Sequence, residues 1–92
     1  MDIEHEPGTG GGRFVTSGGA SELTYRRRDE ETVVFDHTFV PPAERGNGIA
    51  AKLVDAGVAW ARAERVKIVP QCPYVDVLFK RNPQRYADVV AG

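Results

Sequence analysis

The residues that most clearly suggest chemistry lie in a glycine-containing turn, ERGNGIA, which spans residues 44–50. An apolar segment ends at two prolines just before the turn, and a helical pattern of apolar residues begins just after it. A helix N-terminus presents unpaired N–H groups and a partial positive charge. Glycines allow such backbone to approach a phosphate without a collision of side chains. The turn is therefore a candidate site for a phosphate or diphosphate group.

Several interpretations of this turn compete. The simplest is a structural turn before a helix, which any strand-to-helix connection requires. A Walker-type phosphate loop is excluded, because no Gly-Lys-Ser/Thr sequence follows. The segment GNGIAA matches the Gly-x-Gly-x-x-Ala dinucleotide pattern, but the acidic residue expected about 20 positions later is absent from the segment KIVPQ. The remaining interpretation is a diphosphate loop of another family.

The single cysteine, Cys72, is the second candidate for chemistry. It follows a short apolar segment and precedes Pro73, a residue suited to the first position of a helix. Cys72 is then expected at the helix N-cap, where the helix dipole favours a thiolate. A thiolate is a nucleophile that can form a covalent intermediate in a group-transfer reaction. The alternative is a small buried side chain without chemistry, which is the commonest state of a lone cysteine.

His37 is a weaker candidate for chemistry. It is predicted to share one face of a strand with Phe35 and Phe39, whereas Thr38 is predicted to face the other way. A core histidine with one hydrogen bond is the simplest interpretation. The functional alternative is a general base near Cys72 or near an acceptor amine.

The apolar periodicity predicts the elements that position these residues. Two short strands, RFVTSG and SELTYRRR, precede the strongest strand, TVVFDHTFV, at residues 32–40. A helix over residues 48–65, a buried strand RVKIV and a final helix PYVDVLFKR follow. The glycine-rich residues 1–12 lack an apolar pattern and are expected to form a flexible arm before one domain over residues 13–92. The predicted fold class is α/β, with a mixed sheet of about four strands (an antiparallel meander, then a βαβ unit) and two helices.

Composition and charge limit the classes of protein to which the chain can belong. The chain has 92 residues, of which 41% are hydrophobic and 27% charged, as is typical of one small globular domain. The net charge of −1 gives no overall field that would favour nucleic acid or a membrane surface. No apolar run approaches the ~20 residues of a membrane span, and the acidic start lacks the pattern of a secretion signal. We therefore expect a cytoplasmic protein without nucleic-acid or membrane partners, and one cysteine supplies no cysteine cage for a metal.

The turn and the cysteine together resemble a known family. Arg45-x-x-Gly48-x-Ala50 has the form of the Arg/Gln-x-x-Gly-x-Gly/Ala diphosphate loop of the GCN5-related N-acetyltransferases (the GNAT superfamily). With the PQCPY segment at its end, the stretch over residues 37–75 is similar to very small members of this superfamily, which are named for a characteristic cysteine and glycine. The resemblance covers roughly residues 12–86, which is nearly the whole chain.

The resemblance implies a reduced GNAT sheet that binds CoA and acetyl-CoA. It implies that the diphosphate lies on the loop and that the pantetheine arm runs along the strand end. It also implies that Cys72 lies close to the acetyl group, either as an acetylated nucleophile or as a residue that lines the site. The acceptor is an unidentified amine, which a protein or another macromolecule could carry. The expected cofactor-binding residues are Phe39, Val40, Arg45, Gly46, Asn47, Gly48, Ile49, Ala50 and Tyr74, and the expected catalytic residues are Cys72 and His37.

The side chains around the loop leave alternatives open. Arg45 either reaches a CoA phosphate or bonds only to the carbonyls of the turn. Tyr74 either donates a proton to the departing thiolate of CoA or only packs its ring. Lys80 and Arg81 either contact the 3′-phosphate of CoA or interact with the helix dipole.

The sequence therefore predicts an acetyl-CoA-dependent N-acetyltransferase. Acetyl-CoA is expected in an opening where the strands at residues 32–40 and 67–70 separate, because Pro41 and Pro70 each remove a donor near this point. One alternative is a non-catalytic module that binds CoA or acyl-CoA, since the short chain leaves little material for an acceptor pocket. A second alternative is an interaction domain with a vestigial loop, which would bind no CoA.

Overall fold

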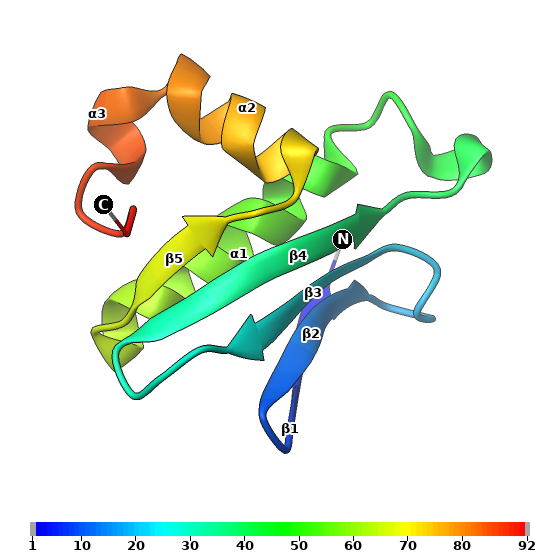
Figure 1. The fold of residues 1–92 in the computed structure, drawn as a ribbon. Coiled ribbons are helices and arrows are strands. Elements are labelled where there is room, and N and C mark those ends of the chain that lie inside the picture. Colours follow the sequence, from blue (N-terminus) through cyan, green and yellow to red (C-terminus); the bar gives the residue numbers. More distant parts are fainter. Residues whose placement is uncertain (1, 92) are drawn as a thin grey trace.

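A five-stranded mixed sheet forms the centre of the protein, as seen in a computed structural model that describes residues 2–91 (Figure 1). The strands are β1 (Ile3–Gly8), β2 (Gly11–Thr16), β3 (Glu22–Arg27), β4 (Thr32–Phe39) and β5 (Lys67–Pro70). Their order in the sheet follows the chain, and the pairs are antiparallel except for the parallel pair of β4 and β5. The helices are α1 (Ile49–Glu64), α2 (Pro73–Arg81), α3 (Pro83–Tyr86) and a 3-10 turn (Pro42–Glu44). The predicted meander and βαβ unit are thus confirmed, with one strand more than expected.

The extra strand comes from the segment that was expected to be a flexible arm. Within residues 1–12, Ile3–Gly8 forms β1 and pairs with β2 along its whole length. His5 attaches this strand to the core, because its ring stacks on Phe14 with centroids 4.4 Å apart and its Nε2 lies 2.7 Å from the hydroxyl of Tyr25. The aromatic anchor explains how a glycine-rich segment without an apolar pattern becomes ordered.

Helix α1 covers one face of the sheet, which we call the helical face. Leu23, Tyr25 and Phe35 point to this face and belong to the same buried cluster as Leu53 of the helix. At Gly57 the helix comes very close to the sheet, since a Cβ atom there would lie 2.7 Å from Cζ of Phe35. The wide apolar stripe of this helix therefore packs on the sheet as its sequence predicted.

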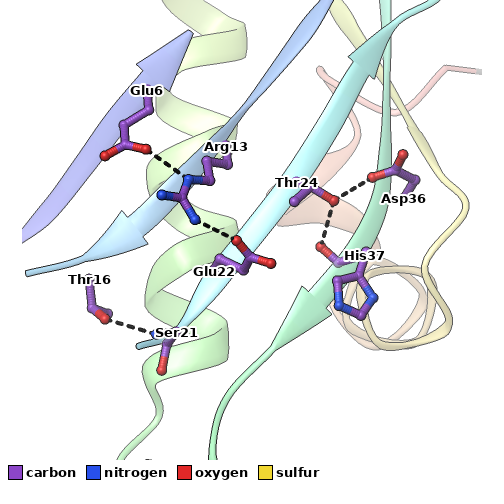
Figure 2. A network of polar contacts seen from close by, with 8 residues as sticks. All are labelled: Glu6, Arg13, Thr16, Ser21, Glu22, Thr24, Asp36 and His37. Atoms are coloured by element: carbon purple, nitrogen blue, oxygen red, sulfur yellow. Dashed lines mark hydrogen bonds and ion pairs between the residues drawn. The ribbon is translucent and has the colours of Figure 1, made fainter. Parts of the chain in front are cut away.

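The face of the sheet turned away from α1, which we call the open face, carries a network of polar side chains (Figure 2). Arg13 joins two carboxylates, with Nε 2.7 Å from Glu6 and Nη1 2.8 Å from Glu22. Further along the face, the hydroxyl of Thr24 donates to Asp36 Oδ1 at 2.6 Å. These contacts mark which residues of each strand point away from the helix.

A β-bulge in β4 changes the alternation of its side chains. Tyr25 pairs with Phe35 and Thr24 pairs with His37, so Asp36 is an extra residue without a partner of its own. One extra residue reverses the direction of every side chain that follows it. His37 therefore lies on the open face with Thr24, whereas strict alternation placed it on the face of Phe35.

The reversal continues to the end of the strand. Phe39 pairs with Glu22 and points to the open face, where its side chain is 45% exposed. Thr38 pairs with the buried Leu23 and turns to the helical face. The sequence predicted the opposite direction for Thr38, because a regular strand pattern contains no sign of the bulge.

The C-terminal helices close the edge of the core beyond β5. Helix α2 has the predicted bounds, whereas α3 is an additional helix beyond the two that the sequence predicted. Tyr86 of α3 stacks on Phe79 with ring centroids 4.5 Å apart, and its hydroxyl donates to Asp55 of α1 at 2.9 Å. None of the helices in residues 2–91 is both long enough and apolar enough to cross a membrane.

Candidate functional site

The candidate site begins where β4 and β5 stop pairing. The last paired residues are Phe35 and Pro70, whereas β4 continues to Phe39. Pro70 has no N–H to extend the ladder, and the last link is the N–H of Cys72, which donates to the carbonyl of Phe35 at 2.9 Å. From there the chain enters α2, while β4 continues with β3 as its one neighbouring strand (Figure 1). The end of β4 thus leaves an unpaired strand edge next to the start of α2.

A pocket of about 220 Å³ lies beside the end of β4, at the start of α1. The turn after β4 forms most of its wall, and the first turn of α2 contributes one side chain. The pocket is lined by Val40, Glu44, Arg45, Gly46, Gly48, Ile49, Ala50 and Tyr74. Among the residues predicted to bind the cofactor, Phe39 and Asn47 lie outside this wall. The structure therefore gathers most of the predicted residues at one place, including Tyr74 from a distant part of the sequence.

The backbone of the turn is exposed toward this pocket. Gly46 and Gly48 have φ angles of +89° and +70°, in the left-handed region, and a Cβ atom at either position would meet nothing within 4 Å. Gly48 is the N-cap of α1, no side chain caps this helix, and its first turn carries no acidic residue. The first N–H groups of α1 therefore have no partner within the helix, and no acidic residue of this first turn neutralises the positive end of the dipole, which faces the pocket.

Arg45 stabilises the turn through hydrogen bonds to two of its carbonyl groups. Its Nε donates to the carbonyl of Val40 at 2.9 Å, and its backbone N–H donates to the carbonyl of Pro42 at 3.3 Å. Of the two roles considered for Arg45, bonding to the carbonyls of the turn is thus present in the structure. The guanidinium also adds a positive charge to the pocket wall.

Cys72 lies at the N-cap of α2, as its sequence position predicted. Its carbonyl accepts a hydrogen bond from the N–H of Asp76 at 2.9 Å, and its thiol makes no capping hydrogen bond to the helix. The thiol instead lies 3.4 Å from the hydroxyl of Thr38, and the residue is only 6% exposed. Thr38 is therefore a residue of the site that the sequence did not predict, brought there by the bulge in β4.

His37 does not join this group. The bulge directs its side chain to the open face, where it is exposed, and directs Thr38 to the side of Cys72. The expected contact of a general base at position 37 with Cys72 is therefore not formed. A role for His37 would require an acceptor amine that approaches from the open face.

Two further candidates lie on α2. Burial raises the pKa of Tyr74, with a smaller contribution from Asp55, so the phenol remains a proton donor at neutral pH. Lys80 forms an ion pair with Asp76 at 2.9 Å, one helical turn away. Within residues 2–91, no group of three or more His, Cys, Asp or Glu side chains is arranged to hold a metal ion.

Comparison with known proteins defines the class to which this fold and site belong. The family model described as GCN5-related N-acetyl-transferase matches residues 13–89. The chain therefore belongs to the GCN5-related N-acetyltransferase family. The solution NMR structure of a GCN5-like protein from Staphylococcus aureus has a TM-score of 0.73 and 28% sequence identity, over 97% of this chain and 88% of that chain. The fold predicted from the resemblance is thus confirmed.

Particular relatives are found among vertebrate proteins. Protein NATD1 of Xenopus tropicalis is 38% identical to this chain over 61 residues, and Protein NATD1 of Homo sapiens is 36% identical over 61 residues. Each match covers 66% of this chain, with 56% of the Xenopus protein and 54% of the human protein. The chain thus spans about half the length of the curated relatives that it matches.

Proposed function

We propose that the protein is an acetyl-CoA-dependent N-acetyltransferase that transfers an acetyl group to an amine. The observation that carries the proposal is the arrangement at the end of β4. Two features meet there. One is the uncapped N-terminus of α1 with its pocket, and the other is the pair of Cys72 and Thr38. Tyr74 connects the two, because it follows Cys72 by two residues and lines the pocket.

The residues present fit a CoA diphosphate. The uncapped N–H groups of α1 would donate to its oxygens, and the left-handed glycines leave room for it to approach the backbone. The pantetheine arm carries amide groups that can pair with the unpaired edge of β4 beyond Phe35. This path leads the thioester from the pocket toward Cys72.

In the proposed reaction the thiol of Cys72 loses its proton to solvent, and its sulfur attacks the carbonyl of the thioester. The bond from the acetyl carbon to the CoA sulfur breaks, and CoA leaves as a thiolate that takes a proton from the hydroxyl of Tyr74, which then regains a proton from solvent. The hydroxyl of Thr38 donates a hydrogen bond to the sulfur of Cys72 while that sulfur is ionised. An amine then attacks the acetyl-cysteine, takes the acetyl group and returns the thiol. The amine is free in solution or carried by a protein.

The test is a direct search for the covalent intermediate. The purified protein is incubated with acetyl-CoA, quenched in acid and analysed by intact mass and peptide mapping. The expected result is one acetyl group on the peptide that contains Cys72, and none in the Cys72→Ser variant. The absence of an adduct, together with no consumption of acetyl-CoA when amines are added, would overturn the proposal.

One observation favours a second candidate, a non-catalytic module that binds CoA or acyl-CoA. The side chain of Cys72 is nearly closed off from solvent, at 6% exposure, which suits a packing role. Such a module would bind CoA with the same loop and transfer nothing. A Cys72→Ala variant that binds CoA as the wild type does, but loses transfer, would count against this candidate.

A further inference from the structure

Two buried hydroxyl residues lie on either side of the turn between β2 and β3. Thr16 and Ser21 are 1% and 0% exposed, respectively. The N–H of Ser21 donates to the hydroxyl of Thr16 at 3.2 Å, a contact shown in Figure 2, and the N–H of Thr16 donates to the carbonyl of Ser21 at 3.0 Å. These bonds fix the position of Ser21, because a buried polar group that loses its partner is costly.

The hydroxyl of Ser21 has its partner in the wall of the candidate pocket. It donates to Oε1 of Glu44 at 2.7 Å, across 23 positions of the sequence. Glu44 ends the 3-10 turn, lines the 220 Å³ pocket and directly precedes Arg45. A carboxylate in the wall of a pocket for a diphosphate would repel the ligand if it could turn toward it. The contact with Ser21 therefore restrains the one acidic side chain in this wall.

We propose that Ser21 is a positioning residue of the CoA pocket, which holds Glu44 so that its carboxylate stays turned from the diphosphate and its backbone sets the course of the loop. The proposal rests on the proposed function, because it assigns Ser21 a role in the same site. Arg45 secures the turn through the carbonyl of Val40, so the loop is held from the residue before β3 and from the residue after β4. Ser21 itself touches no ligand.

The test is a double-mutant cycle on CoA affinity, measured by calorimetry. Because a hydrogen bond to a charged group is strong, Ser21→Ala is expected to weaken CoA binding about tenfold. Glu44→Gln removes the negative charge from the pocket wall and is expected to bind CoA more tightly than the wild type. The variant Ser21→Ala/Glu44→Gln should regain most of the affinity that Ser21→Ala loses, because no charge is left to restrain and only the looser loop remains. Ser17→Ala, at an exposed position of the same turn, is the matched control and should leave affinity unchanged.

Two outcomes of this cycle would overturn the proposal. If the double variant binds as weakly as Ser21→Ala, Ser21 acts through packing and not through the carboxylate. If Ser21→Ala binds as tightly as Ser17→Ala, the contact with Glu44 does not position the loop. Pantetheine, which lacks a diphosphate, is a further probe, and its affinity should be the same with and without Ser21→Ala.

A measurement without ligand separates this proposal from the proposed function. In Ser21→Ala the amides of residues 45–48 are expected to exchange hydrogen faster than in Ser17→Ala, because the loop loses one of its two attachments. Unchanged exchange at these amides would overturn the positioning role, even in a variant that folds normally. A wild-type protein that binds no CoA would instead overturn the proposed function.

Discussion

The change Gly48→Ala tests whether the open backbone of the turn is the ligand site. Gly48 has a φ of +70°, and a Cβ atom there would meet no protein atom within 4 Å. The added methyl group therefore causes no clash inside the protein and projects into open space. In the proposed complex that space belongs to the diphosphate, so the methyl group would keep it away from the N–H groups of α1.

The cost in stability can be worked out separately from the cost in binding. A left-handed conformation costs an L-residue about 1–2 kcal/mol, and the reduced freedom of the unfolded chain returns about 0.4–1 kcal/mol. The free energy of unfolding should therefore fall by about 1 kcal/mol, which lowers the Tm of so small a domain by about 4–8 °C. CoA binding should weaken by more than about tenfold, because the diphosphate loses its close approach to several donors.

Gly10→Ala is the matched control for this change. Gly10 has a φ of +74°, and a Cβ atom there also meets nothing within 4 Å, but it lies in the turn between β1 and β2. Thermal unfolding should show a similar loss of stability for both variants, and calorimetry should show a loss of CoA affinity only for Gly48→Ala. Equal CoA affinity of the two variants would refute the assignment of the turn as the diphosphate site.

Three further changes test other parts of the structure. Gly57→Ala should lower the free energy of unfolding in urea, because its methyl group would lie 2.7 Å from Phe35 and the overpacking cost of about 1–3 kcal/mol exceeds the gain in helix propensity of about 1 kcal/mol. Burial lowers the pKa of His5 from its ordinary value of 6.5, so the unfolded chain binds the proton more readily than the folded protein does. The free energy of unfolding should therefore fall as the pH drops below 6.5, and it should depend less on pH in His5→Gln. Thr38→Val should slow the acetylation of Cys72 about fivefold with unchanged CoA affinity, because one hydrogen bond of about 1 kcal/mol is lost.

Each of these expectations has an outcome that contradicts it. A Gly57→Ala variant as stable as the wild type would mean that α1 lies further from the sheet than described. Identical slopes of stability against pH for wild type and His5→Gln would remove the basis for a half-buried neutral ring at that position. A Thr38→Val variant acetylated at the wild-type rate would leave Thr38 with a packing role only.

Local signals in the sequence were sufficient to predict the backbone of the turn before α1 and the start of α2. Pro73 marks the first turn of α2, so the N-cap position of Cys72 followed from the sequence alone. The glycines at positions 46 and 48 marked the irregular backbone before α1. These features depend on neighbouring residues, which is why they could be predicted.

Features that depend on distant contacts could not be predicted in the same way. The segment TVVFDHTFV looks like a regular strand, and the bulge at Asp36 is set by its pairing with β3. The predicted directions of the His37 and Thr38 side chains were therefore the reverse of those in the structure. Ser21 gave no signal either, because its importance comes from a contact 23 positions away.

The most direct test of the central claim is a titration of the isotope-labelled protein with CoA, followed by the amide signals in NMR spectra. The largest changes are expected at residues 46–50, with smaller ones at Val40 and Tyr74, and they should weaken as the salt concentration rises. Changes confined to other parts of the chain, or no change at all, would contradict the assignment of the α1 N-terminus as the CoA site.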